Sequence, residues 1–338
     1  MPARRCLPRV ARLAGVLDHP AIAVVHHPDR ELAHALGGLV ERLAGQPGPV
    51  VGERKRVQLQ RLDDTPWSAV LATGGDGAWV GYAHLRWEHA HPGGLVASVE
   101  LAVDGDDDVA SDDLLAAARA AIADAGGGRW QLWAHQPVAV RAAERAGLAL
   151  ARRLLLMHAP LTDELPALAA PPTLPEGVTL APLRDGVDDA ALIQANNAAF
   201  ADHPEQGGWS PAELEIRRAA PWYDPTDVLL AWWGQHLLGF HWTKRHPPGQ
   251  RELAGVARLG EVYVLAVHPR AQGMGLGRAL LRAGVARLAE RGCSDAALYV
   301  DVGEPAVSLY EREGFETARV HRCYVGHELG SDGRRAAT

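Results

Sequence analysis

The chain has 338 residues, 47% of them hydrophobic and 22% charged, which is typical of a folded protein of about two domains and excludes a disordered one. Its 34 Lys and Arg residues against 41 Asp and Glu residues give a formal net charge of −7, so no general basic surface is expected to hold nucleic acid. The three cysteines form no CxxC pair, and the sixteen histidines show no metal-binding spacing, so we expect neither a disulfide framework nor a metal site.

The N-terminal residues 1–20 are basic, and Arg and Pro interrupt every apolar run before the core of an export signal forms. We therefore expect an N-terminal extension and a cytoplasmic protein. No stretch approaches the ~20 uninterrupted apolar residues of a membrane span. We expect a monomer.

The first half of the chain, residues 21–161, is expected to form one domain. It contains the strand-like runs WVGYAHLRW and VASVELAVD, then a strand, a helix ending near Gly147, and a last strand. The segment 162–178 is rich in proline and has neither helical nor strand periodicity, which predicts a semi-rigid linker. Residues 179–328 then form a second domain, and residues 329–338 a flexible tail.

The second half repeats the order of elements found in the first. LLGFHWTKR and GEVYVLAVH correspond to the two strand runs above, and the later strand, helix and strand follow in the same order, with Gly314 in place of Gly147. The period is much longer than a solenoid repeat, so we infer duplication of a whole domain. Strands mixed with helices predict an α/β or α+β fold, each domain having a mixed, mostly antiparallel sheet flanked by helices.

The segment EVYVLAVHPRAQGMGLGRALL, residues 261–281, carries the strongest chemical signal. An apolar strand runs into Gln272, Gly273, Gly275 and Gly277 just before an amphipathic helix. Glycines allow tight turns and close approach of a ligand, and a helix N-terminus offers unpaired N–H donors, so a pyrophosphate fits here. The alternative is a loop that needs glycine for its shape alone. The spacing lacks the G-x-G-x-x-G of a dinucleotide site and the lysine of a P-loop.

The run V-H-P-x-x-Q-G-M-G-L-G-R-A-L-L resembles the acetyl-CoA motif of the GCN5-related N-acetyltransferases (GNAT), and LYVDVGEPAVSLYEREGF resembles the second signature of that family. The resemblance implies two tandem GNAT-type domains and acetyl-CoA as co-substrate. Its implied cofactor-binding positions are Leu265, Ala266, Val267, Gln272, Gly273, Met274, Gly275, Leu276, Gly277, Arg278, Glu304 and Ser308. Glu304 stands where family members often have Asn, and the motif is one residue shorter before Tyr310.

A narrower resemblance links four segments, NNAAFADHPEQGGWS, PWYDP, GFHWTK and GEVYVLAVHP, to the mycothiol synthase family. That family acetylates the cysteinyl amine of 1D-myo-inositol 2-(L-cysteinylamino)-2-deoxy-glucopyranoside, the last step of mycothiol biosynthesis. The acceptor-binding positions implied by this resemblance are Glu53, Glu205, Lys244, Glu261 and Tyr299. Without it, each isolated Glu or Lys would be read as a solvated surface charge.

Acetyl transfer needs a neutral amine and a proton for the leaving thiolate, which suggests two catalytic residues. Tyr310 is the candidate acid, because a phenol of pKa ~10 can donate to a thiolate whose conjugate acid has a pKa near ~8.5. A packed core tyrosine is the alternative. Glu261 opens the strand before the glycine loop and is the candidate to take the amine proton, directly or through water, or to bind the ammonium. An exposed strand-end carboxylate is its alternative.

The first half lacks the same chemistry. Alignment of the repeat places Ala143 opposite Tyr310 and Ala97 opposite Glu261, and DGDDDVASDDLL replaces the glycine-rich loop. Carboxylates there would repel a pyrophosphate, so we expect a non-catalytic N-terminal domain. Two other functions stay open for the whole chain: a GNAT enzyme acting on another small amine, and a non-catalytic CoA-binding module.

Overall fold

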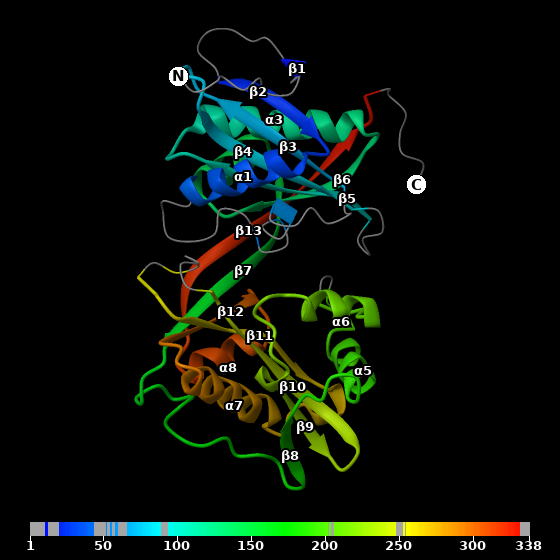
Figure 1. The fold of residues 1–338 in the computed structure, drawn as a ribbon, viewed down its shortest axis with the longest axis vertical. Coiled ribbons are helices and arrows are strands. Elements are labelled where there is room, and N and C mark those ends of the chain that lie inside the picture. The colour runs from blue at the N-terminus through cyan, green and yellow to red at the C-terminus, as the bar shows by residue number, and fades with distance from the viewer. Residues whose placement is uncertain are drawn as a thin grey trace. The chain divides into compact units, whose positions relative to one another are not determined.

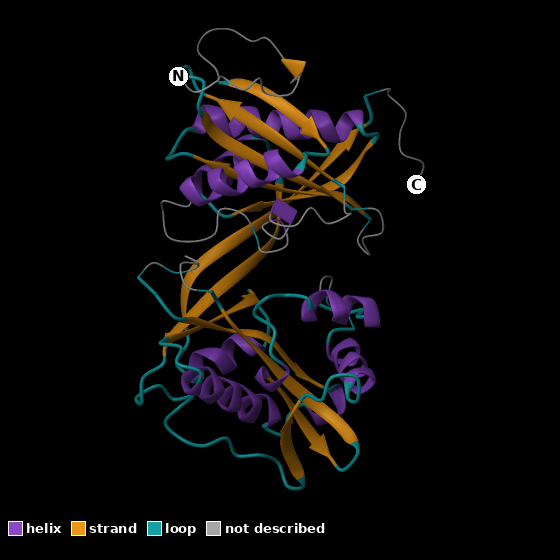
Figure 2. Cartoon of the chain, in the orientation of Figure 1, coloured by secondary structure: helices purple, strands orange, loops and turns teal. Residues whose placement is uncertain are grey.

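The computed structural model describes residues 11–12, 20–43, 52, 55, 58–59, 66–88, 94–201, 203, 206–247, 253 and 255–331. The chain falls into two compact units, shown in Figures 1 and 2. Unit 1 comprises Met1–Arg153, Arg251–Ala254 and His321–Thr338, and unit 2 comprises Leu154–Gln250 and Gly255–Val320. In the part of the chain that the structure describes, no helix combines the length and apolar character needed to cross a membrane.

Unit 1 is a mixed sheet with helices packed on it. Its described strands lie in the order β1-β2-β3-β4-β5-β6-β13, and among them β5 and β6 are the pair that runs parallel. The elements are β1 (Ala11–Arg12), β2 (Ala21–His26), α1 (Arg30–Leu43), β3 (Trp67–Thr73), β4 (Trp79–Trp87), β5 (Leu95–Val103), α3 (Asp108–Asp124), β6 (Gly127–Ala134), α4 (Pro137–Arg145) and the distal part of β13 (Glu316–Leu329).

Unit 2 repeats this plan with the strand order β8-β9-β10-β11-β12-β7, and among its described strands β11 and β12 are the parallel pair. Its elements are β7 (Ala149–Pro160), β8 (Val178–Pro182), α5 (Asp189–Ala199), α6 (Pro211–Arg218), the short 3₁₀ helix η1 (Pro225–Asp227), β9 (Val228–Trp233), β10 (His236–Arg245), β11 (Leu259–Val267), η2 (Pro269–Ala271), α7 (Leu276–Glu290), β12 (Asp295–Asp301) and α8 (Ala306–Arg312). The predicted α/β class, with mostly antiparallel mixed sheets flanked by helices, is confirmed.

The last strand of each half belongs to the sheet of the other unit. From Leu154 to Pro160, β7 pairs with β12 of unit 2, although it follows β6 in the chain. From Arg322 to Leu329, β13 pairs with β6 of unit 1. Leu155, Met157 and Ala159 are accordingly buried in the core of unit 2. The functional division of the chain into the domains expected above stays a prediction.

Helices cover both faces of the unit 2 sheet, as Figures 1 and 2 show. Along β11, Val264 and Ala266 pack with α5 and α6, whereas Leu265 and Val267 face α7, as the alternation of a strand requires. The segment 161–177 contains no helix or strand, but Leu165 and Ala167 are buried against this unit. The end of β11 therefore lies beside α7 and α8, which pack on the same face of the unit 2 strands.

Candidate active site

The two parallel strands of unit 2 separate part of the way along. Their ladder joins Leu259–Glu261 to 295–297, and beyond this point β11 pairs with β10 alone. The N–H of His268 donates to the carbonyl of Leu238 at 2.8 Å, so the neighbouring Val267 and, by alternation, Leu265 direct their backbone N–H and C=O groups away from β10. With respect to the described residues, this edge of β11 therefore presents unpaired backbone donors and acceptors.

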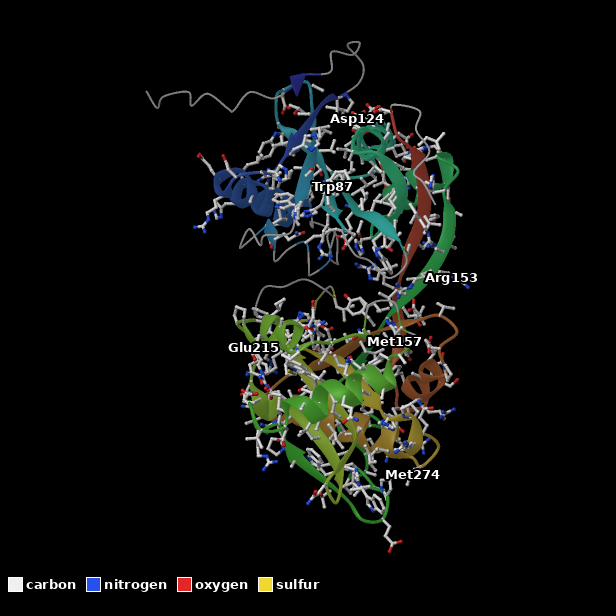
Figure 3. The ribbon with its side chains drawn as sticks, turned by 90° about the vertical axis from the view of Figure 1, so that its right-hand side faces the viewer. Trp87, Asp124, Arg153, Met157, Glu215 and Met274 are labelled. Atoms are coloured by element: carbon white, nitrogen blue, oxygen red, sulfur yellow. The ribbon has the colours of Figure 1, made fainter. Side chains whose placement is uncertain are left out.

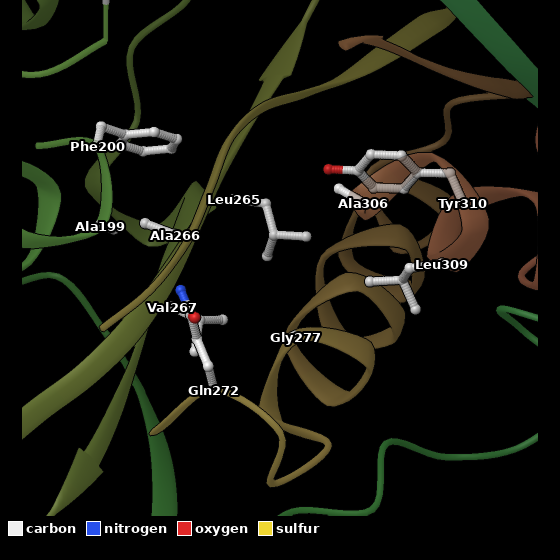
Figure 4. Close-up of a pocket in the computed structure, with 10 residues that line it drawn as sticks. All are labelled: Ala199, Phe200, Leu265, Ala266, Val267, Gln272, Gly277, Ala306, Leu309 and Tyr310. Atoms are coloured by element: carbon white, nitrogen blue, oxygen red, sulfur yellow. The ribbon is translucent and has the colours of Figure 1, made fainter. Parts of the chain in front are cut away.

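A cavity of about 200 Å³ lies between this edge and the two helices (Figure 4). It is lined by Ala199, Phe200, Leu265, Ala266, Val267, Gln272, Gly277, Ala306, Leu309 and Tyr310. The cavity joins the strand to the start of α7 and to α8, and most of its lining is apolar. An extended chain with amide groups suits such a slot, because its polar groups can pair with the strand edge while its carbon atoms contact the apolar walls.

Tyr310 directs its hydroxyl oxygen across the cavity toward Leu265 (Figure 4). Its side chain is nearly buried, its ring packs edge-on against Phe315 with centroids 6.1 Å apart, and burial raises the pKa of the phenol to about 12. Among the described residues, its hydroxyl has no hydrogen-bond partner. The group is therefore protonated at neutral pH and available as a proton donor.

The loop before α7 is shaped by two glycines with left-handed backbones. Gly273 has φ 79° and Gly275, which is the N-cap of α7, has φ 81°, a region that other residues rarely adopt. No side chain caps the helix and its first turn holds no acidic residue, so its backbone N–H groups are open to an anion. Met274, labelled in Figure 3, is 53% exposed in this loop, and Leu276 is buried.

Arg278 is tied to the body of unit 2. Its Nε lies 3.1 Å from Oε1 of Glu313, and Arg282 reaches the other carboxylate oxygen of the same residue at 2.8 Å. Glu313 is buried at the end of α8, so this pair of contacts joins α7 to α8. About half of the Arg278 side chain stays exposed beside the glycine loop. It can add positive charge there without leaving Glu313.

Glu261 and Lys244 are brought together, as cross-strand partners on β11 and β10. Lys244 Nζ lies 3.5 Å from Oε2 of Glu261, and Nε2 of His246 donates to the same oxygen at 2.7 Å. Burial alone would raise the pKa of Glu261, but the charge of Lys244 and the hydrogen bond from His246 outweigh it and lower that pKa. Glu261 is thus a stable carboxylate and a weak base.

Aromatic rings surround Lys244 on its other sides. Its ammonium lies 5.2 Å from the ring centroid of Trp222 and 5.7 Å from that of Tyr263, which is the geometry of cation–π contacts. The lysine side chain is only 3% exposed. Its charge therefore acts strongly on Glu261, because solvent screens it little.

The remaining predicted positions are more dispersed. Tyr299 is half-buried on β12, and Glu304 and Ser308 are exposed at the beginning of α8. Glu53 and Glu205 lie outside the described residues. The assignments of individual site residues, including Glu261 and Tyr310, therefore stay predictions.

Several cavity residues and one partner of Glu261 were not predicted from the sequence. Phe200, Ala306 and Leu309 carry no chemical signal and are identified only by the cavity. His246 follows Lys244 by two residues, so strand alternation places both on the same face and is a usable signal. No sequence motif includes it.

The corresponding part of unit 1 is filled by its own side chains. In unit 1, Ala97 is the counterpart of Glu261. The ladder of β5 and β6 continues three residues beyond Ala97, to Glu100. The carboxamide of Gln136 then accepts from the N–H of Val103 at 2.9 Å and donates to its carbonyl at 3.1 Å. Val103 is the counterpart of Val267, so the backbone groups that Val267 leaves open in unit 2 are paired here.

The aspartate-rich loop of unit 1 is also paired internally. Asp107 caps α3 by accepting from the N–H of Ala110 at 3.0 Å. Arg141 of α4 binds Asp106 and Asp108, and Arg145 binds Asp108 and Asp112. The N-terminus of α3 therefore already has a carboxylate cap, where α7 has none.

Comparisons with known proteins identify the relatives of the chain. A model of the Acetyltransferase (GNAT) family matches residues 193–315. The mycothiol acetyltransferase of Geodermatophilus obscurus is 41% identical over 274 residues, which cover 78% of this chain and 84% of that protein. The mycothiol acetyltransferase of Salinispora tropica is 43% identical over 286 residues, covering 80% and 85%.

Solved structures agree at the level of the fold. A GCN5-related N-acetyltransferase from Sphaerobacter thermophilus has a TM-score of 0.67 at 22% identity, covering 91% of this chain and 96% of that one. A tandem GNAT protein from the clavulanic acid biosynthesis pathway also has a TM-score of 0.67, at 16% identity, covering 90% and 98%. At these identities the likeness concerns the tandem fold alone.

Proposed function

The chain belongs to the mycothiol acetyltransferase family of acetyl-CoA-dependent N-acetyltransferases, and we propose that it transfers acetyl to the cysteinyl amine of 1D-myo-inositol 2-(L-cysteinylamino)-2-deoxy-glucopyranoside, the last step of mycothiol biosynthesis. The observation that carries this proposal is the open edge of β11 facing Tyr310 across an apolar cavity. The relatives support the acceptor, and the cavity supports the donor.

Acetyl-CoA supplies an activated thioester, whose carbonyl carbon the amine attacks while the carbon–sulfur bond breaks. The uncapped amides at the start of α7, with the glycines at 273 and 275, suit its diphosphate. The backbone groups of Leu265 and Val267 suit its amide-bearing arm and can polarise the carbonyl. Gly277 leaves the slot open between the strand and α8.

Tyr310 is proposed to protonate the leaving sulfur. Its buried phenol points across the cavity and holds its proton through the neutral pH range. A thiol has a pKa of ~8.5, well below that of this phenol, so the thiolate alone does not draw the proton away completely. The transfer begins as negative charge develops on sulfur, and it is completed when the phenolate regains a proton from solvent. The apolar surroundings make the neutral products the favoured end state.

Glu261 is proposed to bind and orient the amine rather than to act as a strong base. Its pKa is held low by Lys244 and His246, which makes direct proton abstraction weak. The demand on a base is small, because an α-amine has a pKa of ~7.7–8.0 and is partly neutral at pH 7. The proton lost from nitrogen then passes to water.

We further propose that each chain binds one acetyl-CoA and works as a monomer without nucleic acid. In unit 1, Gln136 occupies the backbone groups of Val103, whose counterpart Val267 is open in unit 2, and Asp107 caps α3. Calorimetry should give one site per chain, and Gly275→Asp should remove it entirely. Retention of one full site by that variant would place acetyl-CoA in unit 1 and refute this part of the proposal.

Thiol release from acetyl-CoA tests the acceptor. Purified protein should release thiol rapidly with the cysteinyl glucosaminyl-inositol, and slowly with the same compound lacking cysteine, with an aminoglycoside or with a polyamine. Faster turnover of one of the other amines would favour an N-acetyltransferase of different specificity. Binding of acetyl-CoA without turnover of any amine would favour a non-catalytic module.

A further inference from the structure

His246 has a fixed place in the site although no catalytic motif includes it. It follows β10 directly, and its backbone N–H donates to the carbonyl of Leu259 at 2.9 Å, so the strand pairing continues through it. Its side chain is 4% exposed, and its Nε2 lies 2.7 Å from Oε2 of Glu261. The backbone pairing and the burial together leave the imidazole little freedom.

The direction of this hydrogen bond follows from the chemistry of its partners. A carboxylate only accepts, so Nε2 of His246 must carry the proton and donate it. Lys244 approaches the same Oε2 at 3.5 Å. Within the described residues, no hydrogen bond or ion pair joins Oε1 to another side chain. One oxygen of Glu261 is therefore held by two donors, and the other can accept from a ligand.

We infer that His246 is a positioning residue for acetyl transfer: its Nε2–H holds Glu261 in the rotamer that presents Oε1 to the acceptor amine. This inference rests on the proposed function, since it assigns Glu261 to the amine. Lys244 alone does not fix the carboxylate as well, because it is 3.5 Å away and its ammonium has no directional fork. A group misplaced by ~1 Å can cost ~10²-fold in rate.

Two amide substitutions separate hydrogen-bond geometry from burial and charge. In His246→Gln the amide nitrogen reaches about as far as Nε2, and in His246→Asn only about as far as Nδ1. Both side chains are uncharged donors, so they differ mainly in whether the donor reaches Glu261. His236→Asn, on the exposed first residue of β10, is the matched control and should behave as wild type.

Steady-state kinetics, acetyl-CoA affinity and thermal unfolding are measured for all four proteins. We expect His246→Gln to keep kcat within about threefold and His246→Asn to lose about 10- to 100-fold, with acetyl-CoA affinity and Tm alike in the two variants. Equal kcat for Gln and Asn, whether both high or both low, overturns the inference. A lower Tm in Asn alone, with kcat unchanged per folded molecule, assigns His246 to stability and also overturns it.

A spectroscopic readout separates this inference from the proposed acceptor. Proton–nitrogen NMR of the wild type should show a slowly exchanging imidazole Nε2–H that is assigned to His246 and lost in Glu261→Ala. If wild type turned over a different amine, the proposed acceptor would fail while the Gln and Asn comparison would proceed with that amine. Absence of the Nε2–H signal in wild type would refute the positioning role directly.

Discussion

Gly277 lies in α7 and lines the cavity, and it has no side chain that could extend into the slot. An added Cβ would lie 3.6 Å from Cγ2 of Val267 and 3.8 Å from Cδ2 of Leu309, which are ordinary contact distances. Its φ lies outside the left-handed region, so alanine fits the backbone. Gly277→Ala should therefore fold normally while one methyl group bridges the slot between the strand and α8.

Opposite effects on stability and binding are expected from this one methyl group. Replacing glycine by alanine in a helix raises the free energy of unfolding by up to about 1 kcal/mol, and less in the first turn, so Tm should be unchanged or raised by about 1–2 °C. Acetyl-CoA affinity should fall by about tenfold or more, or at least about 1.4 kcal/mol, because the bridged slot no longer admits an extended chain.

Calorimetric titration with acetyl-CoA and thermal unfolding of the free protein measure the two effects. Gly37→Ala in α1 is the matched control, since its added Cβ meets nothing within 4 Å and it lies far from the cavity in sequence. It should gain at least as much stability with no loss of affinity. Unchanged acetyl-CoA affinity in Gly277→Ala would show that the ligand does not use this slot.

Three further outcomes can be checked. Tyr310→Phe should lower kcat by about 10²-fold or more with unchanged acetyl-CoA affinity, and a kcat equal to that of wild type would remove Tyr310 from the mechanism. Because burial raises the pKa of Tyr310 to about 12, wild-type turnover should show no alkaline loss from this phenol up to pH 10. Gly275→Asp should abolish acetyl-CoA binding, because the new carboxylate occupies the anion site and a φ of 81° costs a non-glycine residue about 1–2 kcal/mol of conformational free energy. Unchanged affinity would place the diphosphate elsewhere. Burial lowers the pKa of His241 to about 4, so this histidine binds a proton in the unfolded chain at a higher pH than in the folded protein. The free energy of unfolding should therefore drop by about 3 kcal/mol between pH 6.5 and pH 4. In urea titrations His241→Asn should lack this loss, and a parallel fall in both proteins would contradict the prediction.

Local chemistry can be read from neighbouring residues of the chain. The glycines around residues 272–277, placed between an apolar strand and an amphipathic helix, predict an anion-binding turn, and the strand end and helix start lie there. The alignment of Ala143 with Tyr310 predicts the chemical difference between the halves. These signals are local because each depends on backbone geometry or on residue type within a few positions.

The contacts across strands were decided by tertiary structure. Lys244 and Glu261 are seventeen residues apart, and only the register of β10 against β11 makes them partners and adds His246 to the pair. That register lowers the pKa of Glu261 and, of the two roles expected for it, favours binding of the amine over taking its proton.

By itself, the sequence determined the fold class, the duplicated order of elements and the position of the glycine turn, because periodicity and backbone propensity act over short distances. Only the tertiary structure decided where β11 and β12 separate, that Gln136 closes the equivalent edge in unit 1, and that the final strands pair outside their own halves. Strand pairing joins residues far apart in the chain, and its free energy depends on which edges meet, which residue order does not encode locally.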